Sequence, residues 1–244
     1  NIRDGCRESS YTAYVKPHRH RANLTVLTGA LATRIVIENG VATGVEISCG
    51  VGTAYEAVLR GNVSGGDAIV VVGLGPVGMA ALMLAKGRGA RLAIGIDTQA
   101  DRVETARRLG LIDHGLVAGA ETLGEIEALS RGGAGVTIDC SGNPRGRLLD
   151  LQATRTWGRC VYIGETGPVQ FDVSDDLLHR QRTIYGSWVT SVHNMDQCCE
   201  DLDAWGLHPH DIIPDAFGLE EAAAAYALMA GGKSGKVIIA FDGA

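Results

Sequence analysis

Three glycines carry the clearest chemical signature in this chain. Gly73, Gly75 and Gly78 stand in a G-x-G-x-x-G spacing, directly after the apolar run AIVVV and directly before an apolar helical pattern. The first glycine permits a tight turn, the second lets the backbone approach a pyrophosphate, and the third lets helix and strand pack closely. Pro76 and Val77 lie between them, where free N–H groups at the start of the helix would face the anion. The spacing predicts a dinucleotide-binding turn.

An acidic residue stands where such a site needs one. Asp97 ends the next apolar run, about 20 residues beyond the glycines, where a carboxylate can bind the hydroxyls of the adenosine ribose. A carboxylate there repels a 2′-phosphate, so NAD is favoured over NADP. Arg102 keeps NADP open as an alternative, because a nearby arginine can accommodate that phosphate. Thr98, next to the acid, is assigned to the same site.

Two further positions are expected to face the cofactor. Ser141 lies in the stretch DCSGN directly after an apolar run, and Gly164 closes the run GRCVYIG. We interpret DCSGN as a cofactor-facing loop. The alternative is a nucleophile site, but a serine nucleophile needs an adjacent base and the sequence offers Ser141 none that is evident.

Elements that could position these residues follow one another regularly from residue 68. Short apolar runs alternate with amphipathic segments, which is typical of a parallel sheet covered by helices on both faces. Strands are expected at 68–72, 91–97, 135–141, 158–164 and 183–188, and helices at 76–89, 100–110, 144–155, 174–181 and 194–206. The tail at 212–241 adds a strand, a helix and a strand. The predicted fold class is α/β, a doubly wound parallel Rossmann sheet with a small N-terminal β-rich segment.

The N-terminal region has a different pattern. Residues 23–47 contain two strand-like runs separated by Asn39-Gly40, which is a strong signal for a type I′ hairpin. The pattern predicts a β-hairpin here.

Composition excludes several classes of function. The net charge of −6 leaves no basic surplus to neutralise phosphates, which argues against a nucleic-acid binder. No apolar run is long enough to span a membrane, and the polar start NIRDGCRESS does not resemble a signal peptide. The six cysteines are scattered and form no C-x-x-C, so a reducing cytoplasm is expected rather than a disulfide framework.

Residues 47–244 resemble the zinc-dependent medium-chain alcohol and polyol dehydrogenases. The matching stretches are ISCGVGTAYEAVLRGNVSGGDAIVVVGLGPVGMAALMLAKGRGA, IGIDTQADRVETARRLG, TIDCSGNP, TIYGSW and GGKSGKVIIAF. The resemblance implies NAD and zinc as cofactors, an alcohol or polyol as substrate, and leaves open a homo-oligomer through the Rossmann domain. It also implies roles for single residues: Cys49 as the third protein ligand of the catalytic zinc, Thr53 at the nicotinamide, Asp97 and Arg102 at the adenosine ribose, and Lys236 near the pyrophosphate.

Cys49 can also be assessed from its own position. A thiolate at the start of a helix is favoured by the helix dipole and is a good zinc ligand. A buried structural cysteine is the alternative, because a single cysteine makes no metal site.

Residues 1–46 resemble an internal segment of the glucose-methanol-choline flavin oxidoreductases. The stretch DGCRESSYTAYVKPHRHRANLTVLTGALATRIVIENGVATGVE carries this resemblance, which implies strands beside an FAD adenine. The segment lacks that family's own dinucleotide fingerprint and its catalytic histidine, so no bound FAD is expected. The junction near Glu46–Ile47 is therefore expected to join a flavoprotein-like piece to a dehydrogenase from which most of the catalytic domain is missing.

The expected organisation has four parts: a flavoprotein-like segment at 1–46, a catalytic-domain remnant and linking helix at 47–66, an NAD-binding domain at 67–206, and a closing strand-helix-strand unit at 207–244. The leading hypothesis is an NAD(H)-binding oxidoreductase of the zinc alcohol dehydrogenase type. A dinucleotide-binding module without catalysis is the alternative, and a fragment of an FAD-dependent oxidoreductase is a distant third. Zinc is expected to bind weakly or not at all, because catalytic zinc normally takes three protein ligands.

Other histidines and cysteines are expected to be structural. His18 and His20 belong to a solvated basic loop, and His208 and His210 to a loop after a helix. Cys198 and Cys199 are neighbours on a helix, so their side chains point in different directions and cannot share one ligand geometry.

Overall fold

The protein is described by a computed structural model that covers residues 2–3, 6–7, 34–38, 41–46, 49–212, 215–230 and 237–239. The chain divides into two units, Asn1–Ile47 and Ser48–Ala244.

The first unit contains two antiparallel strand pairs. β1 (Ile2–Arg3) pairs with β2 (Cys6–Arg7), and β3 (Arg34–Glu38) pairs with β4 (Val41–Glu46). Glu38 lies opposite Val41, so only two residues separate the paired ends of β3 and β4. This confirms the predicted hairpin, although the Asn39-Gly40 turn itself and residues 23–33 lie outside the described residues.

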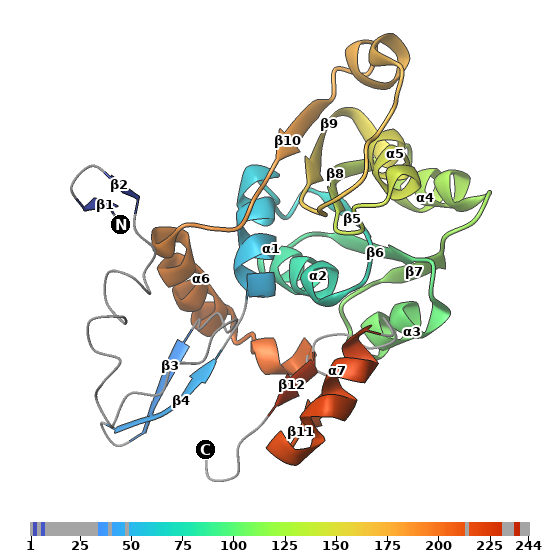
Figure 1. The fold of residues 1–244 in the computed structure, drawn as a ribbon. Helices are drawn as coiled ribbons and strands as arrows, with labels where there is room; N and C mark the ends of the chain where they lie inside the picture. Colours follow the sequence, from blue (N-terminus) through green and yellow to red (C-terminus); the bar gives the residue numbers. More distant parts are fainter. Residues whose placement is uncertain are drawn as a thin grey trace. The chain divides into compact units, whose positions relative to one another are not determined.

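A six-stranded parallel sheet organises the second unit (Figure 1). Its strands are β5 (Ala68–Val72), β6 (Leu92–Asp97), β7 (His114–Val117), β8 (Ala134–Asp139), β9 (Thr154–Tyr162) and β10 (Thr183–Gly186). They lie in the order β10-β9-β8-β5-β6-β7, and every neighbouring pair is parallel. From β5 the chain first adds strands on one side, β6 and β7, and then on the other, β8 to β10, so the strand order reverses between β5 and β8. This is the topology of a doubly wound Rossmann sheet, and ligands of such sheets bind beyond the carboxyl ends of the strands at that point.

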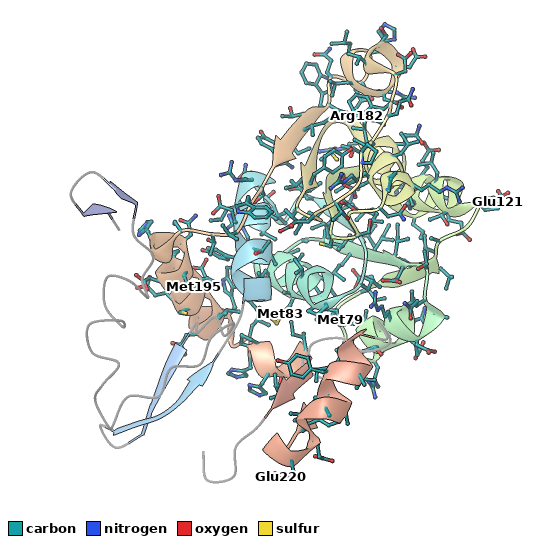
Figure 2. All side chains as sticks on the ribbon, viewed as in Figure 1. Met79, Met83, Glu121, Arg182, Met195 and Glu220 are labelled. Atoms are coloured by element: carbon teal, nitrogen blue, oxygen red, sulfur yellow. The ribbon has the colours of Figure 1, made fainter. Side chains whose placement is uncertain are left out.

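Helices cover both faces of this sheet, which confirms the predicted fold class. They are α1 (Cys49–Arg60), α2 (Pro76–Gly87), α3 (Ala100–Arg108), α4 (Thr122–Ser130), α5 (Pro144–Ala153) and α6 (Val192–Trp205). Successive residues of a strand point to opposite faces. Ile69 and Val71 of β5 accordingly belong to a core cluster with α1, α2, α3 and α6, whereas Val70 and Val72 belong to a second cluster with α4 and α5. Met79 and Met83 of α2, labelled in Figure 2, are buried in the first cluster.

Several elements differ from the sequence-based expectation. β7 and α4 were not predicted. The run HGLV, which forms β7, is short and only partly buried at the edge of the sheet. β9 begins at Thr154 rather than at residue 158, and β10 ends at Gly186 rather than at 188. The helix expected at 174–181 is a π-helix, η3 (Val173–Leu178), whose start is capped by Asp172 through the backbone N–H groups of Ser174 and Asp175.

The C-terminal region follows the predicted strand-helix-strand order. A 3₁₀ turn, η4 (Pro209–Ile212), leads to β11 (Asp215–Phe217), a second turn η5 (Leu219–Glu221), α7 (Ala222–Ala230) and β12 (Val237–Ile239). β11 and β12 pair in parallel. Among the described residues, no helix combines the length and the apolarity needed to cross a membrane.

Candidate dinucleotide site

The glycine turn lies where β5 ends. Gly73 has a φ of +96°, a conformation that L side chains rarely adopt, and its N–H donates to the Ile96 carbonyl at 2.8 Å. A Cβ at Gly73 would stand 2.8 Å from the backbone nitrogen of Ser141. The first glycine is therefore required both by its backbone angle and by the loop that follows β8.

The start of α2 leaves space for an anion. Gly75 is the N-cap, its cap makes no side-chain hydrogen bond, and a Cβ built on it would meet nothing within 4 Å. Pro76 takes the first helical position, followed by Val77. A Cβ on Gly78, by contrast, would collide with the Gly73 carbonyl oxygen. The first N–H groups of a helix lack intrahelical acceptors, so this turn offers donors and an open approach to a diphosphate.

Asp97 is held against this turn. Its side chain is buried, and Oδ2 accepts the Leu74 N–H at 2.7 Å, while Oδ1 accepts the Gln99 N–H at 2.9 Å. Arg102 Nη1 lies 3.5 Å from Oδ2, and the Thr98 hydroxyl lies 3.5 Å from Oδ1. A carboxylate offers about four acceptor positions, of which the two backbone N–H groups fill two. The contacts with Arg102 and Thr98 are long, at 3.5 Å, so ribose hydroxyls can replace them. The structure thus brings the predicted acid and the predicted glycines together.

The loop after β8 is organised by a second buried carboxylate, which sequence reasoning missed. Asp139 accepts the Ser141 N–H at 3.0 Å and the Ser141 hydroxyl at 2.5 Å, both through Oδ1, and the Gly142 N–H at 3.2 Å through Oδ2. Asp139 is fully buried. Asp139 therefore fixes the loop through Ser141 and Gly142. Ser141 lies in this loop and next to Gly73 of the glycine turn.

Loops beyond β8 and β9 then meet backbone to backbone. A Cβ on Gly164 would collide with the Gly142 nitrogen, and one on Gly142 would collide with the Glu165 carbonyl oxygen. The Gly164 N–H donates to the Asp139 carbonyl at 2.9 Å. Contacts therefore run without a break from Asp97 through the glycine turn and Ser141 to Gly164, along the carboxyl edge of four neighbouring strands. We call this set of contacts the carboxyl-edge seam.

The start of α1 lies beside the start of α2. A Cβ on Gly50 would stand 3.8 Å from Cγ2 of Val77, which places the beginning of α1 near the glycine turn. Cys49 is the first residue of α1, as the helix-start prediction requires, but its side chain lies outside the described part of the chain. Thr53 stands one turn further along α1 and is partly buried. Lys236 also falls outside the described residues.

Potential metal ligands are scattered among the described side chains. No group of three or more His, Cys, Asp or Glu residues in that part of the chain could hold a metal ion. The rings of His208 and His210 stack with centroids 5.3 Å apart and planes 17° apart. Cys198 is buried and Cys199 exposed, in agreement with their predicted divergence, and burial raises the pKa of the Cys198 thiol to about 12. The described residues alone therefore do not make a zinc site.

Comparison with known proteins identifies the family. The family model described as zinc-binding dehydrogenase matches residues 76–204. This chain belongs to the zinc-binding dehydrogenase family. NAD and zinc are the cofactors of that family. A second model, described as GMC oxidoreductase, matches residues 1–103, which confirms the resemblance noted for 1–46 and overlaps the first match.

Individual zinc-type dehydrogenases support this assignment. The chain is 60% identical over 199 residues to an uncharacterized zinc-type alcohol dehydrogenase-like protein, YphC, of Escherichia coli K12, covering 81% of this chain and 56% of that protein. It is 31% identical to mouse sorbitol dehydrogenase, covering 76% and 53%. Among solved structures, benzyl alcohol dehydrogenase from Acinetobacter calcoaceticus superposes with a TM-score of 0.71 at 26% identity, covering 78% and 54%. The chain spans about half the length of the curated relatives it matches.

Proposed function

We propose that this dehydrogenase-family chain binds NAD(H) along the carboxyl-edge seam. The observation that carries the proposal is the position of Asp97, whose carboxylate accepts the Leu74 N–H inside the glycine turn at 2.7 Å. An acid in that place can receive the adenosine ribose while the adjacent helix start receives the diphosphate. We assign the cofactor site to Thr53, Gly73, Gly75, Pro76, Val77, Gly78, Asp97, Thr98, Arg102, Ser141, Gly164 and Lys236.

The activity proposed for the chain is that of an oxidoreductase acting on a small alcohol or polyol. In such chemistry the nicotinamide accepts hydride from the alcohol carbon, and the protein supplies binding, orientation and exclusion of water. Here the carboxyl-edge seam would orient the dinucleotide. Cys49 remains the proposed zinc ligand, and zinc, where bound, supplies a Lewis acid for the alcohol oxygen.

A binding module without catalysis is the second candidate. The observation that favours it is the glycine turn with Asp97, because this arrangement can bind a dinucleotide without any catalytic group. The proposed organisation keeps the boundaries 1–46, 47–66, 67–206 and 207–244. A reducing compartment is included in the proposal, supported by four free cysteines among the described residues. A homo-oligomer through the Rossmann domain also remains a proposal.

Calorimetric titration with NADH and NADPH tests the cofactor assignment. Asp97→Ala removes the group proposed to bind the ribose hydroxyls, so the affinity for NADH should fall by about tenfold to a hundredfold, the range for hydrogen bonds to a charged group. The affinity for NADPH should change little. Asp113→Ala is the matched control, because Asp113 accepts the Ala93 N–H at 2.7 Å just as Asp97 accepts that of Leu74, but next to the first residues of β6 and β7.

Equal losses for NADH and NADPH in Asp97→Ala, or no NADH binding by the parent, would contradict the cofactor assignment. Addition of alcohols and zinc to the NAD-loaded chain then separates the two candidates. Turnover supports the oxidoreductase, whereas cofactor binding without turnover supports the module.

A further inference from the structure

One arginine links the two loops that follow β8 and β9. Arg147, in the first half of α5, is only 14% exposed, and its Nε lies 3.4 Å from Asp139 Oδ2. Its two terminal nitrogens donate to the carbonyl oxygens of Gly164 and Gly167. The guanidinium also lies over the Tyr162 ring, 5.9 Å from its centroid. All three guanidinium nitrogens are therefore used, each on a group at or beyond the end of a strand.

Tyr162 returns the contact. Its hydroxyl donates to the Arg147 carbonyl oxygen at 3.1 Å, so the end of β9 and the first half of α5 are joined in both directions. Burial raises the pKa of the Tyr162 phenol, which keeps the hydroxyl protonated and able to donate.

The partners of Arg147 lie at the last residue of β8 and in the loop that follows β9. Gly164 and Gly167 follow the last residue of β9, and a Cβ on Gly167 would stand 2.8 Å from the Gly142 carbonyl oxygen. The strands themselves are already joined by the β8–β9 ladder. Arg147 binds two carbonyls of the 163–167 loop and also Asp139, which holds the 140–143 loop. Arg147 therefore helps to fix the distance between the two loops.

A second arginine makes similar bonds elsewhere. Arg182 donates to the carbonyl oxygens of Asp176 and Gln152, both at 2.9 Å. It immediately precedes the first residue of β10, and Gln152 lies at the end of α5 just before β9 begins. Arg182, labelled in Figure 2, therefore links the end of α5 to η3 near the amino end of the sheet, opposite to the end where Arg147 lies.

We propose that Arg147 is a positioning residue that fixes the 140–143 and 163–167 loops for the nicotinamide half of NAD(H). This inference rests on the proposed function. A dinucleotide lies across the point where the strand order reverses, so if Asp97 and the glycine turn hold the adenosine half, the other half extends over the loops after β8 and β9. The planar fork of arginine suits two carbonyls and one carboxylate together, which a single ammonium cannot reproduce.

Paired titrations with NADH and ADP-ribose test this role. ADP-ribose shares the adenosine, the diphosphate and the second ribose with NADH but lacks the nicotinamide. In Arg147→Gln the affinity for NADH should fall by about tenfold, equivalent to roughly 1.4 kcal/mol, while the affinity for ADP-ribose stays within about twofold. Arg147→Lys should show the same selective loss. Arg182→Gln is the matched control and should leave the NADH to ADP-ribose ratio unchanged, even if it lowers the melting temperature.

Emission of bound NADH gives a second readout, since it reports the surroundings of the nicotinamide ring. The emission spectrum of NADH bound to Arg147→Gln should move toward that of free NADH, and that of Arg182→Gln should match the parent. Equal losses for both ligands, or an unchanged ratio in both Arg147 variants, would overturn the positioning role alone. Failure of the parent to bind either ligand would overturn the proposed function as well. If Arg147→Gln does not fold, the Arg147→Lys ratio decides.

Discussion

The two halves of the parallel sheet are built by different means. On the β5–β6 side, both strands carry apolar residues that are buried along almost their whole length, and the buried acid Asp97 stands only at the strand end. On the β8–β9 side, Asp139 likewise stands at a strand end, but further polar groups are buried inside the layers: Thr137, Asp150, Thr154 and Cys160. Glycines are closely packed in both halves, at the turn after β5 and in the loops after β8 and β9, but only the second half also has several hydrogen bonds buried inside its layers. The first half should therefore respond mainly to added volume, and the second also to lost or added charge and donors.

The polar interior of the second half is centred between α5, β8 and β9. The hydroxyls of Thr137 and Thr154 lie 2.8 Å apart, and the Cys160 thiol lies 3.3 Å from Asp150 Oδ2. Burial, reinforced by the neighbouring charge of Asp139, raises the pKa of the Asp150 carboxyl well above its usual value. Asp150 Oδ1 is buried without a hydrogen-bond partner. A neutral, protonated Asp150 is the form that this interior favours.

The largest effect is expected from added volume at the glycine turn. Gly78→Ala places a methyl group against the Gly73 carbonyl and should lower the free energy of unfolding by about 3 kcal/mol, the upper part of the range for overpacking. Gly75→Ala is the matched control, because its Cβ meets nothing. That variant should keep its stability in urea denaturation and lose affinity for NADH. If the two alanine variants are equally stable, close packing does not shape this half.

The next effect concerns charge in the second half. The pKa of Asp150 is raised on folding, so its contribution to stability is complete below the unfolded pKa of about 3.9 and decreases as the pH rises toward the folded value. Asp150→Asn removes this dependence. The stability difference, variant minus parent, should therefore grow between pH 5 and pH 6, by at most about 1.4 kcal/mol, the linkage limit for one proton.

Chemical denaturation at the two pH values measures this difference. Asp101→Asn changes an exposed acid on α3 and serves as the control, with a constant difference expected. A constant difference in Asp150→Asn as well would mean that Asp150 is charged in the folded protein, and the contrast between the halves would be smaller than described.

The smallest effect is expected from a single hydroxyl. Thr137 of β8 lies opposite Val70 of β5 in the sheet register, so Thr137→Val makes this point of the second half resemble the first. Loss of the hydrogen bond to Thr154 should cost about 1 kcal/mol of unfolding free energy. Thr183→Val, at an exposed position of β10, should change stability by less than about 0.5 kcal/mol. Thermal unfolding of both variants decides whether the buried hydroxyl pair contributes.

Sequence patterns predicted the two halves unequally, for the same physical reason. The apolar runs, the glycine spacing and Asp97 form local patterns, and the structure places them together as expected. Hydrophobic periodicity does not report hydrogen bonds between loops, so Arg147 and Gly167 gave no signal, and Gly164 was assigned to the cofactor site without its bond to Arg147. β7 was missed because a short, half-exposed edge strand has little apolar pattern. Cys49 and Lys236 remain predictions from family resemblance.

The central position of β5 has a consequence for synthesis of the chain. One edge of β5 pairs with β6, but the other edge pairs with β8. The first residue of β8, Ala134, lies 62 positions after Val72, the last residue of β5. At roughly 5–20 residues per second, ribosomes need several seconds to cover that interval. Throughout that time AIVVV has an unpaired apolar edge, which is a template for association with other chains. A nascent chain halted before β8 would therefore depend on chaperones to stay unaggregated.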